Sequence, residues 1–304
     1  MIKIKSICNW ASSEDITRRL LEQFKTSESD LDGVEFVHDD TYDVCVVFGY
    51  VSEKIKDDVK ILLFPQEPTW TGGHQKNFDR LIKVFGYDKL KYSQPDMVTE
   101  TVAHMFYGST GPWQEGWDFW NYNNVMDSKF EKTKGICSFI SNRGINDESH
   151  PEGCLYGDRL NLVKSISDNV PFVDFYGWGE GNGSNLKPFM LRKGDTIKEY
   201  KFCLTVENSN EKHYISEKFY DCILTNTIPI YFGCSNVRDY WSENDIILLD
   251  NITDHQYVID KLQWINENCD ELYDKMLPNL LKMKDRYFSE FNLLKKIRKE
   301  IYEF

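Results

Sequence analysis

Short apolar runs alternate with segments of helical spacing along this chain, and this alternation limits the folds that are open to it. Residues 42–49 (YDVCVVFG) and 59–64 (VKILLF) are almost continuously apolar, as strands buried on both faces of a sheet are. Residues 12–25 open with two serines and two acids and then carry apolar residues at helical spacing. Together with a strand candidate at residues 2–8, this order predicts an α/β domain with a mostly parallel sheet.

A second strand–helix series follows residue 128. Its expected elements are residues 135–142, 158–168, 170–177, 201–209, 216–226 and 227–233, and the tail from residue 254 has a mostly helical pattern. The length of 304 residues also suits two domains. We therefore predict two Rossmann-like domains that face each other across a cleft, over residues 1–128 and 129–304. Ligands should then bind at the carboxyl ends of the strands.

The charge balance narrows the class of partner. Thirty-six Lys and Arg residues against 49 Asp and Glu residues give a net charge of −13, which suits neither a nucleic-acid polymer nor an anionic membrane. No window approaches the roughly 18 apolar residues of a membrane-spanning helix. The apolar start of the chain is also too short for a secretory signal peptide. We expect a soluble, cytoplasmic protein with no nucleic-acid partner and no membrane span.

The eight cysteines form no CxxC pair, and most of them lie in apolar runs. The six histidines do not cluster near them at the spacing of metal ligands. We therefore expect buried, reduced thiols rather than disulfides or a zinc site.

The loop FPQEPTW (residues 64–70) places a carboxylate, Glu67, directly after a buried strand and between two prolines. A carboxylate held there near Phe64 and Trp70 should have a raised pKa and could act as a general base. The alternative is an exposed loop glutamate.

The segment from residue 202 to 233 is the richest in candidate chemistry. It predicts a strand, a polar loop, a helix that begins near Ser216, and a second strand. A helix N-terminus binds anions through its free N–H groups, and Lys218 would add a positive charge where an anion such as a diphosphate could sit. A capping box with surface charges would explain Ser216 and Glu217 but not Lys218.

Two other motifs have simpler interpretations. The acidic segment DDTYD (residues 39–43) precedes a strand rather than following one, so we interpret it as a solvated turn and not as a metal-binding D-x-D. The segment GWGEGNGSN (residues 177–185) does not meet the G-x-G-x-x-G pattern, so it is either a flexible turn or a loop near a nucleotide.

Ordered blocks of this sequence resemble the signature of glycosyltransferase family 10, the α1,3/4-fucosyltransferases. FCLTVENS, YISEK and TIPIYFG are similar to the family's donor motif, and CSFISN, GDRLNLV and VDFYG are similar to a second block. Ser216 and Val206 stand where the family usually has Thr and Phe. The resemblance is specific over residues 135–233. Over the N-terminal domain it rests on α/β order and the PQEP loop.

The resemblance implies a GT-B fold with the donor nucleotide in the C-terminal domain and the acceptor mainly on the N-terminal one. It also implies an inverting transfer of L-fucose from GDP-β-L-fucose to a hydroxyl group of an acceptor glycan. Glu67 would be the general base, Arg159 and Lys218 would hold the diphosphate, and Glu217 would bind the ribose. The full set of implied donor-binding residues is Asn142, Arg159, Glu207, Asn208, Tyr214, Glu217 and Lys218. Arg143 remains an alternative to Arg159.

A diphosphate held by two cations and a helix start does not strictly require a metal, so we expect no metal or other cofactor to be essential. Two other functions stay open. One is the same fold and mechanism with another nucleotide-sugar donor, and the other is a glycan-binding protein without turnover. The acceptor is not identified by the sequence. The aromatic segment GPWQEGWDFW (residues 111–120) could contact it or could be a domain-boundary segment.

Overall fold

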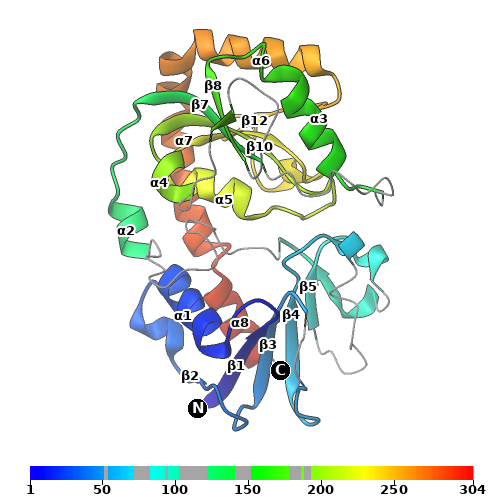
Figure 1. Cartoon of the computed structure of the whole chain (residues 1–304). Helices are drawn as coiled ribbons and strands as arrows, with labels where there is room; N and C mark the ends of the chain where they lie inside the picture. The colour runs from blue at the N-terminus through cyan, green and yellow to red at the C-terminus, as the bar shows by residue number, and fades with distance from the viewer. Residues whose placement is uncertain are drawn as a thin grey trace.

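The computed structural model describes residues 1–50, 54–71, 83–92, 95–102, 122–140, 152–177, 186–187 and 193–303. They form two α/β domains, one above the other in Figure 1, and each is built on a six-stranded sheet. All the strand pairs recorded in the two sheets are parallel, as the sequence predicted.

The first sheet has the strand order β2-β1-β3-β4-β5-β6. Its strands are β1 (Ile2–Cys8), β2 (Val34–Phe36), β3 (Val44–Phe48), β4 (Lys60–Phe64), β5 (Lys83–Gly86) and β6 (Val98–Glu100). All five residues of β3 are buried because the strand lies at the centre of the sheet, where Val46 pairs with Ser6 on one side and Leu62 on the other. The short strands β5 and β6 were not predicted.

The second sheet has the order β12-β11-β10-β7-β8-β9. Its strands are β7 (Lys134–Ile140), β8 (Val173–Gly177), β9 (Leu186–Lys187), β10 (Tyr200–Val206), β11 (Ile228–Phe232) and β12 (Ile247–Leu248). The predicted strands at 135–142, 170–177, 201–209 and 227–233 are therefore confirmed as β7, β8, β10 and β11. The two-residue strand β9 was missed because so short an element carries no periodic pattern.

Helices cover both sheets. They are α1 (Ser13–Phe24), α2 (Tyr122–Asp127), α3 (Tyr156–Ile166), α4 (Lys193–Ile197), α5 (Glu217–Leu224), α6 (His255–Glu267), α7 (Cys269–Ser289) and α8 (Leu293–Tyr302). The predicted caps of α1 and α5 are confirmed, because the Ser12 and Ser216 side chains accept hydrogen bonds from backbone N–H groups in the first turns. Among the helices that the structure describes, none combines the length and the apolar composition that a membrane crossing would need.

The end of the chain returns to the first domain. Helix α7 runs from the second domain toward the first, and α8 packs beside α1, so that both chain ends lie in the same domain (Figure 1). Asn292 makes the turn between α7 and α8. Its side-chain amide donates to the carbonyl oxygens of Phe24 (2.8 Å) and Phe288 (3.1 Å), and its Oδ1 accepts from the N–H of Lys295. The boundary predicted at residue 128 stays a prediction.

Each sheet has one point at which the strand order changes direction. In the first sheet this point lies between β1 and β3, and in the second it lies between β7 and β10. The loops that leave neighbouring strands at such a point run to opposite faces of the sheet, which opens a ligand-binding crevice at the carboxyl ends. Asn9 and Gly49 follow the strands at the first point, and Glu207 and Asn208 follow β10 at the second.

All eight cysteines are free thiols, and six of them are buried. The sequence predicted buried thiols, and this is confirmed for these six.

Asn292→Ala should destabilise the protein by about 2–4 kcal/mol. The variant loses a helix cap and leaves two carbonyl oxygens in a buried site without a donor. Urea denaturation followed by circular dichroism measures the change. Asn169→Ala is the matched control, because the exposed side chain of this asparagine donates to the Ser165 carbonyl, and loss of that bond should cost no more than about 0.5 kcal/mol. Equal losses in both variants would contradict the assignment.

Candidate active site

Glu207 organises the segment that joins β10 to α5, which we name the 207–216 loop. Its fully buried carboxylate accepts hydrogen bonds from the Ser216 backbone N–H (2.8 Å) and the Ser216 hydroxyl (2.5 Å). The close approach of Glu207 requires Gly233, because a Cβ there would lie 2.4 Å from Glu207 Cγ. Burial raises the pKa of Glu207 above its ordinary value. These contacts hold the first turn of α5, and direct contact of Glu207 with a donor stays a prediction.

Lys218 lies in that first turn, surrounded by acids. Its Nζ lies 2.9 Å from Glu217 Oε1 and 3.8 Å from Glu207 Oε2. Burial works against the charge, but these two carboxylates outweigh it and raise the pKa of Lys218. The sequence argument left this lysine without a partner in the protein, and the structure supplies two. Both Lys218 and Glu217 are partly exposed, with 17% and 32% of their side chains accessible, so a ligand can reach them.

Arg159 reaches the same loop from α3. It is 1% exposed, and its Nη1 donates to Asn208 Oδ1 at 2.6 Å while the guanidinium lies 5.2 Å from the ring centre of Tyr156. Burial lowers the pKa of Arg159 from its ordinary value, and the nearby Tyr156 and Glu207 oppose this shift. The residue still carries its charge at neutral pH because a guanidinium starts from so high a value. The structure thus brings Arg159, Asn208 and Lys218 to one end of β10.

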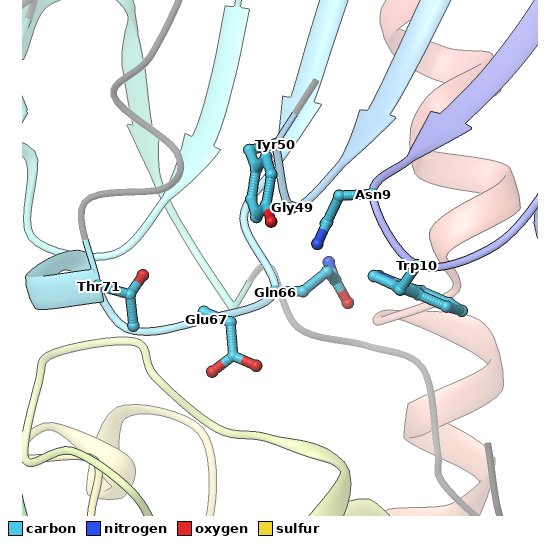
Figure 2. Close-up of a pocket in the computed structure, with 7 residues that line it drawn as sticks. All are labelled: Asn9, Trp10, Gly49, Tyr50, Gln66, Glu67 and Thr71. Carbon is cyan, nitrogen blue, oxygen red and sulfur yellow. The ribbon is translucent and has the colours of Figure 1, made fainter. Parts of the chain in front are cut away.

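Glu67 lies on the opposite side, in the first domain. It lines a pocket of about 150 Å³ at the carboxyl ends of β1, β3 and β4 (Figure 2). The lining residues are Asn9, Trp10, Gly49, Tyr50, Gln66, Glu67 and Thr71. Gly49, at φ 83°, comes close to Asn9, because a Cβ there would lie 2.8 Å from Asn9 Oδ1. The Glu67 carboxylate points away from the strands of the first sheet, toward the second domain (Figure 2).

The apolar surroundings expected for Glu67 were wrong. Its side chain is exposed. Phe64 instead stacks on Phe85 in the core at 4.6 Å, and Trp70 packs edge-on against Tyr156 of the second domain at 5.7 Å. Phe64 and Trp70 therefore pack against other aromatic rings and do not enclose the Glu67 carboxylate.

Residues 65–71, which we name the Glu67 loop, meet the 207–216 loop across the domain interface. The buried Glu211 carboxylate accepts the backbone N–H of Thr69 with both oxygens, at 3.1 and 3.2 Å. Nearby, the rings of Tyr87 and Tyr214 pack edge-on at 5.1 Å, and the Tyr87 hydroxyl donates to the Pro65 carbonyl at 2.9 Å. Glu211 is not among the residues that the sequence analysis selected, since no local pattern marks a contact with a residue 142 positions away.

Other sequence predictions are placed as follows. Asn142, Arg143, residues 111–120 and residues 178–185 lie outside the described residues. The 39–43 segment is a surface turn before β3, as predicted, with the Asp39 carboxylate accepting the N–H and hydroxyl of Thr41. Within the described ranges, no group of three or more His, Cys, Asp or Glu residues is arranged to hold a metal ion.

Comparison with known proteins decides the family of the second domain. Residues 129–277 match the model of the glycosyltransferase family 10 (fucosyltransferase) C-terminal region. This segment belongs to glycosyltransferase family 10. It includes Arg159, the 207–216 loop and Lys218, so the residues brought together at the end of β10 all lie inside the family match.

Two relatives illustrate the extent of the similarity. The α-(1,3)-fucosyltransferase FucT of Helicobacter pylori is 23% identical over 175 residues, which cover 57% of this chain and 34% of that protein. The α-(1,3)-fucosyltransferase B of Drosophila melanogaster is 30% identical over 124 residues, which cover 36% of this chain and 27% of that protein. The chain therefore spans about a third or less of the length of these curated relatives.

Solved structures establish the fold over almost the whole chain. A crystal structure of an α1,3-fucosyltransferase with GDP-fucose has a TM-score of 0.53 at 16% identity and covers 96% of this chain and 90% of that one. A DNA-modifying β-glucosyltransferase has a TM-score of 0.58 at 11% identity and covers 98% and 99%. The chain thus has the GT-B fold, which the sequence predicted. Likeness at these identities shows the fold and does not select the donor.

His213 is a half-buried residue of the 207–216 loop. It has a φ of 63°, contacts the Tyr240 hydroxyl through Nδ1, and has a pKa that burial lowers below the ordinary value. Because the pKa of His213 is lower in the folded state than in the unfolded state, the neutral imidazole contributes to the free energy of unfolding at pH values above the unfolded-state pKa of about 6.5. This contribution is lost as the pH falls through the folded-state pKa.

We therefore expect the free energy of unfolding to fall more between about pH 7.5 and about pH 5.5 in the wild type than in His213→Asn. Asparagine tolerates the left-handed backbone and does not titrate in this range. Urea denaturation at the two pH values measures the difference, and His38→Asn is the control for an exposed histidine elsewhere in the chain. Equal pH dependence in the wild type and His213→Asn would contradict this role.

Proposed function

We propose that this protein is an inverting glycosyltransferase that moves L-fucose from GDP-β-L-fucose to a hydroxyl group of an acceptor glycan. The observation that carries the proposal is the pairing of two sites. Arg159, Asn208 and Lys218 gather at the end of β10 inside the family 10 match, and the Glu67 carboxylate points from the first domain toward the second. The fucosyltransferase relatives support fucose as the transferred sugar.

On the donor side, Arg159 and Lys218 would bind the diphosphate. The planar guanidinium suits paired phosphate oxygens, and Lys218 together with the N-terminus of α5 adds positive charge. A phosphate at Lys218 would replace Glu217 as its partner, which leaves the Glu217 carboxylate to accept hydrogen bonds from ribose hydroxyls. These groups would stabilise the negative charge that grows on the diphosphate as the bond to the sugar breaks.

On the acceptor side, the pocket beside Glu67 would hold the sugar whose hydroxyl reacts. Trp10 supplies an aromatic face at its edge, and Asn9 lies between Trp10 and Gly49 (Figure 2). Glu67 would take the proton from the acceptor hydroxyl as its oxygen attacks C1 of fucose. The C1–O bond to GDP breaks on the opposite face of the ring, so the β-linked donor yields an α-linked product.

The proposal includes no essential metal or other cofactor, because the two cations and the helix start are the groups assigned to the diphosphate charge. A transferase with another nucleotide-sugar donor is the second candidate. The same arrangement of Arg159, Lys218 and the start of α5 would hold the diphosphate of any nucleotide sugar. A glycan-binding protein without turnover would use the same pocket but would not need Arg159 and Lys218 near a helix start.

Donor preference is tested by thermal shift. A ligand at about 100 times its Kd stabilises the folded state by about 2.7 kcal/mol. We expect GDP to raise the Tm by a few degrees and UDP at the same concentration to raise it less. GDP-fucose should be the sugar nucleotide consumed in a screen of donors and acceptors, with or without EDTA. Stabilisation by UDP and not by GDP would contradict fucose as the transferred sugar.

The two assigned roles should separate in mutants. Glu67→Gln should lower turnover by about 100-fold to 10,000-fold because it removes the base, with GDP affinity nearly unchanged. Lys218→Ala should weaken GDP binding by about tenfold to a hundredfold. Titration calorimetry and initial rates measure these effects, with exposed residues as matched controls in Glu35→Gln and Lys212→Ala. Near-normal turnover in Glu67→Gln would assign the base elsewhere.

A further inference from the structure

Glu211 differs from Glu207, the other acid of the 207–216 loop, because it has partners in the first domain. Its side chain is 0% exposed, and the backbone N–H of Thr69 donates to both of its oxygens. Lys91, also from the first domain, lies 4.0 Å away and supplies a positive charge. A carboxylate this deeply buried is costly unless it is hydrogen-bonded, so these contacts stabilise the closed interface at this point.

Thr69, whose N–H donates to Glu211, lies two residues after Glu67. Pro68 stands between them and fixes one backbone dihedral, and the N–H of Thr71 donates to the Pro68 carbonyl at 3.1 Å to close a turn. The position of the Thr69 amide therefore determines where the Glu67 backbone lies.

Glu211 is joined just as directly to the donor side. The Ser209 hydroxyl donates to its Oε1 at 3.2 Å, and Ser209 directly follows Asn208, which accepts the guanidinium of Arg159. One carboxylate thus connects the loop that carries the candidate base to the loop that carries the candidate diphosphate ligands.

We propose that Glu211 is a positioning residue, which sets the separation of Glu67 from the donor site by binding the Thr69 amide across the domain interface. This inference rests on the proposed function. It predicts an effect on the rate of transfer rather than on nucleotide binding, because a displacement of about 1 Å between reacting groups can lower the rate about 100-fold.

The test changes each side of the contact separately. Glu211→Ala removes the acceptor, and Glu211→Gln retains one oxygen that can still accept from Thr69. Thr69→Pro removes the N–H at the second position of the turn that Pro68 and Thr71 close, where proline is favoured. Thr69→Ala is its control, since it loses the threonine side chain but keeps the amide.

We expect Glu211→Ala and Thr69→Pro each to lower kcat by about tenfold to a hundredfold, with the Kd for GDP changed by less than about threefold. Glu211→Gln should recover part of the rate. The double variant Glu211→Ala/Thr69→Pro should be no slower than the worse single variant, because both changes remove the same bond. Additive losses, or an unchanged kcat in either single variant, would overturn the proposal.

A matched control addresses stability. Glu300 is also a buried carboxylate, paired with Lys83 between α8 and β5. Glu300→Gln should lower the free energy of unfolding without lowering the kcat of the folded protein. A fall in kcat in Glu300→Gln equal to that in Glu211→Ala would mean that general destabilisation explains both, and the proposal would be wrong.

Hydrogen exchange separates this proposal from the proposed function. The Thr69 amide should exchange at least about tenfold faster in Glu211→Ala than in the wild type, because it loses its acceptor. If the wild type neither binds GDP nor transfers fucose while the exchange changes as expected, the proposed function fails and the contact is upheld. Unchanged exchange would overturn the contact itself, whatever the activity.

Discussion

The buried carboxylate of Glu207 determines the path of the chain between β10 and α5. It binds the backbone and side chain of Ser216, which in turn caps α5 and so orients the free N–H groups at the start of that helix. Gly233 is needed because any side chain there would occupy the space of Glu207. Lys218, Asn208 and Glu211 all take their places from this arrangement.

Although the net charge of the chain is −13, two cations lie together at the end of β10. Lys218 is paired with Glu207 and Glu217, and Arg159 lies against Asn208 and Tyr156. Each cation therefore has neighbours that keep it in place at the end of β10. On the proposed function, a diphosphate would replace the partly exposed Glu217 at Lys218 rather than the buried Glu207.

Within the described residues, the two domains meet through loop contacts that differ in kind. Glu211 and Thr69 contribute hydrogen bonds, whereas Tyr87 with Tyr214 and Trp70 with Tyr156 contribute edge-on aromatic contacts. The covalent connection adds another link, because α8 returns to pack on α1 after the second sheet is complete. The relation between the two sites thus depends on side chains far apart in the sequence.

The sequence by itself determined the α/β class, the parallel sheets and the cap of α5, because these follow from local periodicity and from residues within one turn of each other. It also singled out Arg159, Asn208 and Lys218, which lie near one another in the structure. Only the tertiary structure decided the exposure of Glu67, the acidic partners of Lys218 and the contact of Glu211 with Thr69. Burial and pairing depend on residues brought together by folding. Glu211 meets Thr69 across 142 positions, and no local pattern encodes such a contact.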